Sequence, residues 1–157
     1  MVNSILNYFE YDRNLAAGGQ PTVEQIHSLH SEGVNAIVNI SPASTKNYLP
    51  SEAHVAELLG LIYVHFPVDC SNLKEHHYTT FKNILNSLNG KKVFVHCGGN
   101  IKSSNLIHMY RVLELGEDET ESFRTLQKIQ DPEIKWDDYF KSHGMQGFSC
   151  IDEMKVA

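Results

Sequence analysis

The sequence predicts an α/β fold: a single domain with a mostly parallel central sheet flanked by helices. Three short apolar runs rich in β-branched residues, at 35–40, 61–68 and 92–97, predict buried strands. Between these runs, and after the last of them, apolar residues recur at helical spacing and predict helices. Such alternation of strand and helix is typical of a parallel sheet. The length of 157 residues fits one domain that includes the whole chain, 1–157.

The predicted helices follow from caps, apolar spacing and stop signals. Thr22 and Gln25 form an expected capping box at the start of a helix that Gly33 ends. Further helices are expected over 51–60, 73–88, 103–115, 118–130 and 135–142, each with apolar residues along one face. The residues after Gly144 are expected to form a tail.

The composition limits the partners and the compartment. A formal net charge of −6 is unfavourable for nucleic-acid binding, which needs a basic surface, although it allows a local anion site. Three cysteines are few and odd in number, so we expect reduced thiols. The N-terminal residues lack a signal-peptide pattern, and no apolar run is long enough to cross a membrane. We therefore expect a cytoplasmic protein without nucleic-acid or membrane partners, and the oligomeric state stays open.

A candidate reactive cysteine ends the third predicted strand. Cys97 comes directly before a predicted helix, and ligands of parallel sheets bind outside the carboxyl ends of the strands. The thiolate is the nucleophilic form of cysteine, and the unpaired amides and dipole at a helix start stabilise an anion. The alternative is a buried strand-end cysteine that only fills space in the core. We favour a nucleophile because of the residues that follow.

The loop after the cysteine supplies what an anion site needs. Gly98 and Gly99 allow a tight turn of the backbone, so that its amides can surround a phosphate. Lys102 adds a cation. The hydroxyl of Ser103 or Ser104 can hydrogen-bond the thiolate and help it to leave from a cysteinyl-phosphate.

The stretch HCGGNIKSS, 96–104, resembles the signature of the cysteine-based phosphatases, which is His-Cys, a short loop, Arg and then Ser or Thr. Four residues separate Cys97 from Lys102 where the usual loop has five. This shorter spacing is found in a bacterial group, the beta-lactamase-hydrolase-like phosphatases. The segments AGGQPTVEQI at 17–26 and VNAIVNISP at 34–42 also resemble that group. The resemblance runs in order from about Leu15 to Leu115.

The resemblance implies a dual-specificity-phosphatase-like fold and hydrolysis of a phosphate monoester through a cysteinyl-phosphate on Cys97. The substrate would be a phosphorylated small molecule or a phosphoprotein, and inorganic phosphate or sulfate would fit the same loop. His96 would hold the loop and tune the thiolate, unless it is only a core histidine. The phosphate-binding residues would be Gly98, Gly99, Asn100, Ile101, Lys102 and Ser103, supported by Ser104. No cofactor is implied, and no HExxH or finger-type Cys/His spacing indicates a metal.

Lys102 departs from the phosphatase signature. Arginine binds two phosphate oxygens with a flat fork, whereas lysine is a hydrated point charge. Loss of one transition-state hydrogen bond worth about 2–4 kcal/mol slows a reaction by about 10²–10³-fold. The sequence thus predicts an anion-binding loop more firmly than rapid turnover. Arg13 or Arg111 could supply the missing guanidinium from elsewhere in the chain, but each is interpreted more readily as a surface charge.

Two further residues have a catalytic and a structural interpretation each. Asp69 follows the second predicted strand, at the edge where Cys97 is expected, and is the candidate general acid; alternatively it caps the turn. Glu75, His76 and His77 come shortly after it. Gln20 in GGQPT could position the phosphate or a water, although a tight turn and helix cap is the plainer interpretation.

Three functions compete at the level of sequence. The first is a phosphatase with Cys97 as nucleophile. The second is a catalytically weak phosphate- or sulfate-binding pseudophosphatase that kept the loop and lost the arginine. The third is a rhodanese-like sulfurtransferase, because that loop also has a cysteine, four residues and a cation. His96 directly before Cys97 and the GGQPT segment favour the first.

Overall fold

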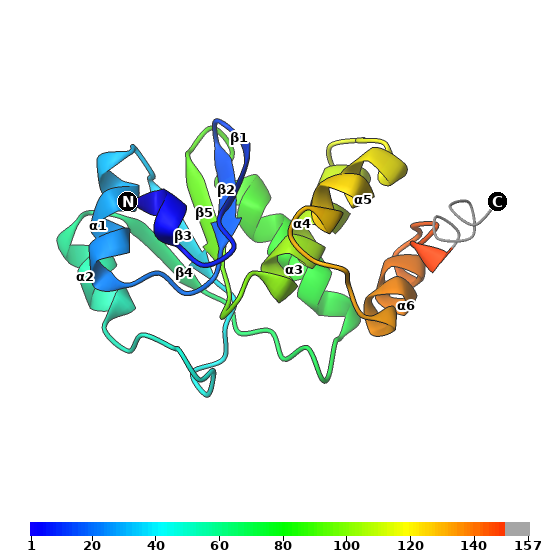
Figure 1. The fold of residues 1–157 in the computed structure, drawn as a ribbon, viewed down its shortest axis with the longest axis horizontal. Coiled ribbons are helices and arrows are strands. Elements are labelled where there is room, and N and C mark those ends of the chain that lie inside the picture. Colours follow the sequence, from blue (N-terminus) through cyan, green and yellow to red (C-terminus); the bar gives the residue numbers. More distant parts are fainter. Residues whose placement is uncertain (150–157) are drawn as a thin grey trace.

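The computed structural model describes residues 1–149 and has the predicted α/β fold with a mostly parallel sheet (Figure 1). Residues 150–157 of the predicted tail lie outside the described part. The sheet has five strands in the order β1-β2-β5-β3-β4, of which only the β1–β2 pair is antiparallel. The strands are β1 (Phe9–Asp12), β2 (Leu15–Gly18), β3 (Ala36–Asn39), β4 (Ile62–His65) and β5 (Val93–His96).

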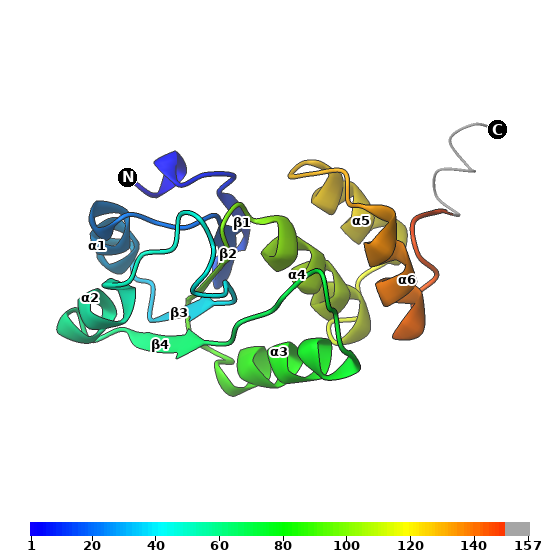
Figure 2. The same ribbon diagram turned by 90° about the horizontal axis from the view of Figure 1, so that it is seen from below.

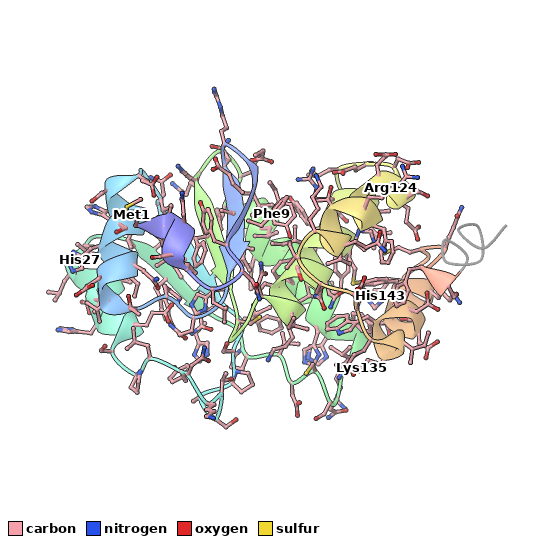
Figure 3. All side chains as sticks on the ribbon, in the orientation of Figure 1. Met1, Phe9, His27, Arg124, Lys135 and His143 are labelled. Atoms are coloured by element: carbon pink, nitrogen blue, oxygen red, sulfur yellow. The ribbon has the colours of Figure 1, made fainter. Side chains whose placement is uncertain are left out.

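Helices cover both faces of the sheet. The helices are α1 (Val23–Ser31), α2 (Glu52–Leu58), α3 (Glu75–Ser87), α4 (Ile101–Leu113), α5 (Glu119–Gln127) and α6 (Ile134–Ser142), with a short 3-10 helix at Val2–Ser4. Figure 2 shows α1 and α2 on one face, α3 and α4 on the other, and α5 and α6 on the outer side of α4. Exposed side chains such as His27 of α1 and Arg124 of α5 lie at opposite sides of the molecule (Figure 3).

Two apolar clusters, one on each face, hold the layers together. Phe94 of β5 packs with Ile26 and Leu29 of α1 on one face. Val95, the next residue of β5, belongs to the other cluster with Phe81 of α3 and Leu106 of α4. Successive strand residues therefore point to opposite faces, and both faces of β3 and β5 are buried as predicted.

The predicted helices are present with different ends. The capping box of Thr22 and Gln25 is confirmed, with Gln25 N donating to Thr22 Oγ1 and Thr22 N donating to Gln25 Oε1. The fourth predicted helix, expected from Ser103, begins at Ile101 because Asn100 acts as its N-cap in the left-handed conformation, at φ 66°. Helix boundaries of this kind depend on local geometry that apolar spacing does not encode.

Two features of the sheet differ from the prediction. The second predicted strand, at 61–68, is only partly buried: β4 lies at the edge of the sheet and Ile62 is 40% exposed. The β1–β2 hairpin was not predicted, because β2 has the sequence LAAG, which is poor in strand-forming residues. Close packing favours glycine at position 18, since a Cβ there would lie 2.9 Å from Ile5 Cγ2.

Candidate active site

Cys97 lies at the carboxyl edge of the sheet, as its position in the sequence predicts. It follows β5 directly, and its side chain is 1% exposed. The loop 98–100 then leads into α4. Since β2, β3 and β5 are parallel, the segments that leave β2 and β3 lie at the same edge.

The carbonyl groups of Gly98 and Gly99 are held by residues from three other segments. Gly98 O accepts hydrogen bonds from Gln20 N at 3.1 Å and from Asn47 Nδ2 at 2.9 Å. Gly99 O accepts one from Asn7 Nδ2 at 3.0 Å. Sequence reasoning missed Asn7 and Asn47, which carry no local signal of this contact.

The two neighbouring carbonyls are held in the same way. Cys97 O accepts from His96 Nδ1 at 3.2 Å, and Asn100 O accepts from Ser104 Oγ at 2.5 Å. In a planar trans peptide the N–H points opposite to the C=O, so these contacts direct the next amides to the other side. The amides of Gly98, Gly99 and Ile101 donate to no backbone group within residues 1–149. The loop therefore presents unpaired donors ahead of the α4 dipole, which is the chemistry of an anion site.

Gly98 and Gly19 serve close packing rather than an unusual backbone conformation, whereas a Cβ on Gly99 would meet nothing within 4 Å. A Cβ on Gly98 would lie 2.9 Å from Thr45 Cγ2, and a Cβ on Gly19 would lie 2.7 Å from Gly98 O. Neither Gly98 nor Gly99 has a positive φ; in this loop only Asn100 does. The expectation that the paired glycines let the loop turn is thus refined: Gly98 lets the 41–50 segment approach, and Asn100 makes the sharp bend.

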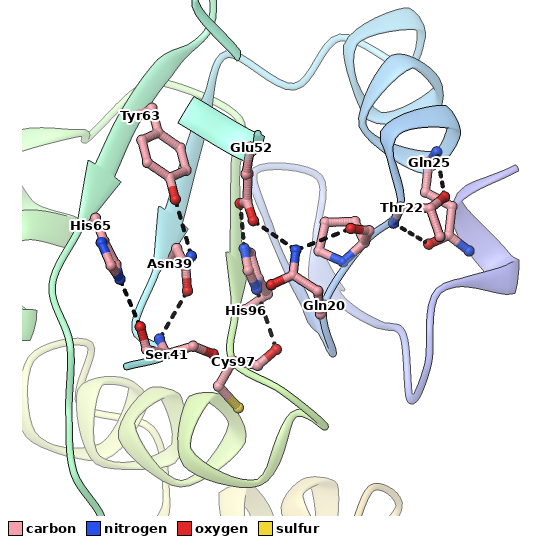
Figure 4. Close-up of polar contacts among 11 residues, drawn as sticks. Gln20, Thr22, Gln25, Asn39, Ser41, Glu52, Tyr63, His65, His96 and Cys97 are labelled. Atoms are coloured by element: carbon pink, nitrogen blue, oxygen red, sulfur yellow. Dashed lines mark hydrogen bonds and ion pairs between the residues drawn. The ribbon is translucent and has the colours of Figure 1, made fainter. Parts of the chain in front are cut away.

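A buried polar chain lies beneath the loop (Figure 4). His96 Nε2 is 2.5 Å from Glu52 Oε2, with both side chains almost fully buried. Gln20 Nε2 donates to Glu52 Oε1 at 2.7 Å and to Pro21 O at 3.0 Å. Gln20 therefore contacts the loop with its main-chain N–H, and it contacts Glu52 with its side-chain amide. Sequence reasoning missed Glu52, which looks like an ordinary acid in the first turn of a helix.

A second polar chain fixes the start of the 41–50 segment. Asn39 Oδ1 accepts from Ser41 N at 2.8 Å, while Asn39 Nδ2 donates to Tyr63 Oη at 3.0 Å. His65 Nε2 contacts Ser41 O at 2.6 Å (Figure 4). These contacts tie the end of β3 to β4, and so they position the segment that carries Asn47.

Lys102 is half-buried and bridges the Cys97 loop to the segment that carries Asp69. Its Nζ donates to Val68 O at 2.8 Å. The two arginines do not replace it: Arg13 lies in the turn between β1 and β2 at the opposite edge of the sheet, and Arg111 lies in the last turn of α4. Lys102 is therefore the cation that α4 places next to the loop.

Asp69 lies in an exposed turn after β4. It accepts hydrogen bonds from Ser71 Oγ at 2.7 Å and Ser71 N at 2.9 Å. These bonds hold the pKa of Asp69 below its usual value, and the charges of Lys102 and His77 lower it further. The carboxyl group thus caps its own turn, which was the structural interpretation. It also lies in the field of Lys102.

The residues after Asp69 have other partners. His77 is buried, and its Nδ1 accepts from Lys74 N at 3.0 Å. Burial, together with the neighbouring His76 and Lys74, lowers the pKa of His77. Glu75 and His76 are exposed in the first turn of α3.

The two serines differ in their contacts. Ser104 Oγ donates to Asn100 O and accepts from Gln130 Nε2 at 2.6 Å, so its role is to hold the loop. Ser103 Oγ is buried and has no hydrogen-bond partner among the described residues. Of the two hydroxyls, that of Ser103 is available to a group in the loop.

Within residues 1–149, no three His, Cys, Asp or Glu side chains are grouped as a metal site would need. In the same part of the chain, none of the helices has the length and apolar character for a membrane span.

The chain has the fold of the dual-specificity-like cysteine phosphatases of known structure. No family model and no curated protein matches the sequence. Among solved structures, a DUF442 protein from Shewanella putrefaciens CN-32, described as a candidate phosphatase, superposes with a TM-score of 0.78 at 24% identity over 91% of this chain and 92% of that chain.

Two other phosphatase structures share the fold. The core catalytic domain of the PP-IP phosphatase SIW14 from S. cerevisiae gives a TM-score of 0.74 at 17% identity, over 87% of this chain and 85% of that one. P. aeruginosa TpbA gives 0.70 at 15% identity, over 87% and 84%. The fold expected from the resemblance is thereby confirmed.

Proposed function

We propose that the protein is a phosphatase that hydrolyses phosphate monoesters through a cysteinyl-phosphate on Cys97. The observation that carries the proposal is the loop after Cys97: its carbonyls accept hydrogen bonds from surrounding groups, while the amides of Gly98, Gly99 and Ile101 donate to no backbone group within residues 1–149. A phosphoryl group has three peripheral oxygens to match such donors, and their charge is stabilised at a helix start. SIW14 was crystallised with citrate and a TpbA variant with phosphotyrosine, so both of those proteins accept an anion.

The chemistry has two steps. In the first, the Cys97 thiolate attacks phosphorus, the P–O bond of the ester breaks, and Asp69 gives a proton to the leaving oxygen. In the second, water attacks phosphorus, gives a proton back to Asp69, and the P–S bond breaks to release phosphate. The Ser103 hydroxyl, which has no other partner among the described residues, donates to the departing sulfur.

The cradle consists of Gly98, Gly99, Asn100, Ile101, Lys102 and Ser103, with His96, Ser104 and Gln20 holding it in shape. Lys102 supplies the positive charge that the equatorial oxygens need. In the unliganded protein its ammonium group is bonded to Val68 O. A phosphate would compete with that carbonyl for the same donors.

Two observations favour the second candidate, a phosphate-binding pseudophosphatase. The cation is bonded to a backbone carbonyl and the acid carries a lowered pKa, so neither group is set for catalysis in the unliganded protein. Three assays separate the functions. Hydrolysis of para-nitrophenyl phosphate with competitive inhibition by phosphate is expected. Phosphate binding without turnover would favour the pseudophosphatase, and sulfur transfer from thiosulfate to cyanide would favour a rhodanese activity.

The role of Asp69 is tested by the leaving group. Asp69→Asn is expected to slow hydrolysis strongly for alkyl phosphates, whose alkoxide needs a proton, and little for para-nitrophenyl phosphate. An acid must be protonated to act, so activity is expected to fall as the pH rises through the pKa of Asp69. Because that pKa is lowered, the fall is expected at low pH. Ser71→Ala removes one stabilising bond and is expected to shift that fall to higher pH. An equal small effect of Asp69→Asn on every substrate would exclude the acid role.

The role of Asn47 is tested by phosphate affinity. Asn47→Ala removes one of two donors to Gly98 O and is expected to weaken phosphate binding by about three- to tenfold, from a bond worth about 1 kcal/mol. Calorimetric titration with inorganic phosphate measures it. Asn3→Ala, at an exposed asparagine outside the site, is the control and should bind as the unmodified protein does. Unchanged affinity in Asn47→Ala would mean that Gln20 N alone suffices.

A further inference from the structure

Glu52 and His96 form a buried pair that the proposed reaction does not use directly. The side chains are 1% and 0% exposed, and Glu52 Oε2 lies 2.5 Å from His96 Nε2. Glu52 is at the start of α2, while His96 ends β5, so the contact joins a helix to the residue directly before the nucleophile. Burial of two titratable groups is costly unless their partners are well placed. The contacts on the other side of the ring indicate what the pair does.

The hydrogen-bonding partners fix where the protons are. Cys97 O can only accept, so His96 Nδ1, at 3.2 Å from it, must carry a hydrogen. A proton must also lie between Nε2 and Glu52 Oε2, either as imidazolium with carboxylate or as neutral imidazole with carboxylic acid. The remaining tautomer, with hydrogen on Nε2 alone, would place a bare Nδ1 against the Cys97 carbonyl.

Gln20 completes the arrangement from the other side. Its Nε2 donates to Glu52 Oε1 at 2.7 Å, which leaves Oε2 for the histidine. Tyr63 is a titratable group whose pKa is raised by burial and also by the Glu52 charge, and its hydroxyl accepts from Asn39 Nδ2. Gln20 also donates through its main chain to Gly98 O, so one residue holds both the carboxyl and the loop.

We propose that Glu52 is a positioning residue for the phosphatase reaction, acting through His96. By anchoring His96 Nε2, it holds the ring with Nδ1 against the Cys97 carbonyl, and this contact directs the Gly98 amide toward the proposed phosphate cradle. The inference rests on the proposed function for its kinetic readout, whereas its binding and spectroscopic readouts do not need turnover. If the pair only supported the fold, substitution of Glu52 in a folded protein would leave the binding and spectroscopic readouts unchanged.

The test compares two substitutions at one position. In Glu52→Gln the amide can donate to His96 Nε2 and accept from Gln20, so kcat/KM and phosphate affinity are expected to stay within about threefold. In Glu52→Leu both contacts are lost, and an unsatisfied buried group costs enough to lower kcat/KM by about ten- to a hundredfold, with a parallel loss of phosphate affinity. Glu24→Leu, at an exposed first-turn acid of α1, is the matched control and should be silent.

Nitrogen-15 NMR of the His96 ring supplies the readout that a structural role would not move. The Nδ1 hydrogen is expected to be held against the Cys97 carbonyl, and so to exchange slowly with solvent, in the unmodified protein and in Glu52→Gln. In Glu52→Leu the ring loses its anchor at Nε2, so faster exchange of that hydrogen is expected. Full activity and affinity in a folded Glu52→Leu protein would overturn the proposal, as would equal losses in both variants. If Glu52→Leu does not fold, a bare Nδ1 in the unmodified protein overturns it instead. Phosphate binding without hydrolysis would reject the proposed function alone, since affinity and NMR still test Glu52.

Discussion

Replacement of Cys97 by serine is expected to lower hydrolysis of para-nitrophenyl phosphate by about 10⁴–10⁶-fold, the range seen when a catalytic nucleophile is removed. The serine hydroxyl is not ionised at working pH, so it cannot attack phosphorus as a thiolate does. The amides that face the phosphate belong to the backbone and remain. Phosphate affinity should therefore stay close to that of the unmodified protein.

The contrast between rate and affinity makes this result diagnostic. Cys70→Ser, at the other free cysteine among the described residues, is the matched control and should keep its activity. A Cys97→Ser protein that still turns over would mean that another group attacks phosphorus. Loss of phosphate binding in that variant would mean that the thiol shapes the loop, and that the amides alone do not hold the anion.

Lys102→Arg is expected to raise kcat/KM by up to about 10²–10³-fold. A guanidinium has five donors, so it can retain a bond to Val68 O and still present two parallel N–H groups to the phosphate. The gain corresponds to one recovered transition-state contact of about 2–4 kcal/mol. Steady-state kinetics with a phosphate monoester measure it.

The neutral variant Lys102→Met is the control for charge. The kcat/KM of this variant should be lower than that of the unmodified protein, because the substitution removes the only cation that α4 places at the loop within residues 1–149. A rise in Lys102→Arg together with a fall in Lys102→Met would show that charge is necessary and that the fork adds to it. A fall in both would mean that the pocket is shaped for lysine.

The parts of the fold that the sequence predicts are those with a strong local signal. The runs that became β3 and β5 are apolar and β-branched, and both strands are fully buried. The run at 61–68 has the same composition and yet became an edge strand, because composition does not state which neighbours a strand will have. The LAAG strand was missed for the opposite reason: its residues have low strand propensity, and close packing by Ile5 and Phe94 favours glycine at position 18.

The same distinction between local and distant signals applies to the residues of the candidate site. The motif around Cys97 is contiguous, and it predicted the strand end, the loop and the helix. The residues that hold the loop in shape are distant in sequence: Asn7 is 92 residues from Gly99, Asn47 is 51 from Gly98, and Glu52 is 44 from His96. Each contact joins one polar side chain to a partner that only the folded chain brings near, so no spacing pattern marks it.

The contact between Asn7 and the loop has a consequence for how mutations in this protein would be interpreted. Asn7 has a φ of 51°, donates to Gly99 O, and accepts from Asn100 Nδ2 through its own carbonyl, so the N-terminal segment and the loop hold each other. A substitution that loosens the first turn would release the Gly99 carbonyl and weaken the anion site from a distance. In an activity screen, such a change would be mistaken for damage to the Cys97 loop, although every residue of that loop is intact.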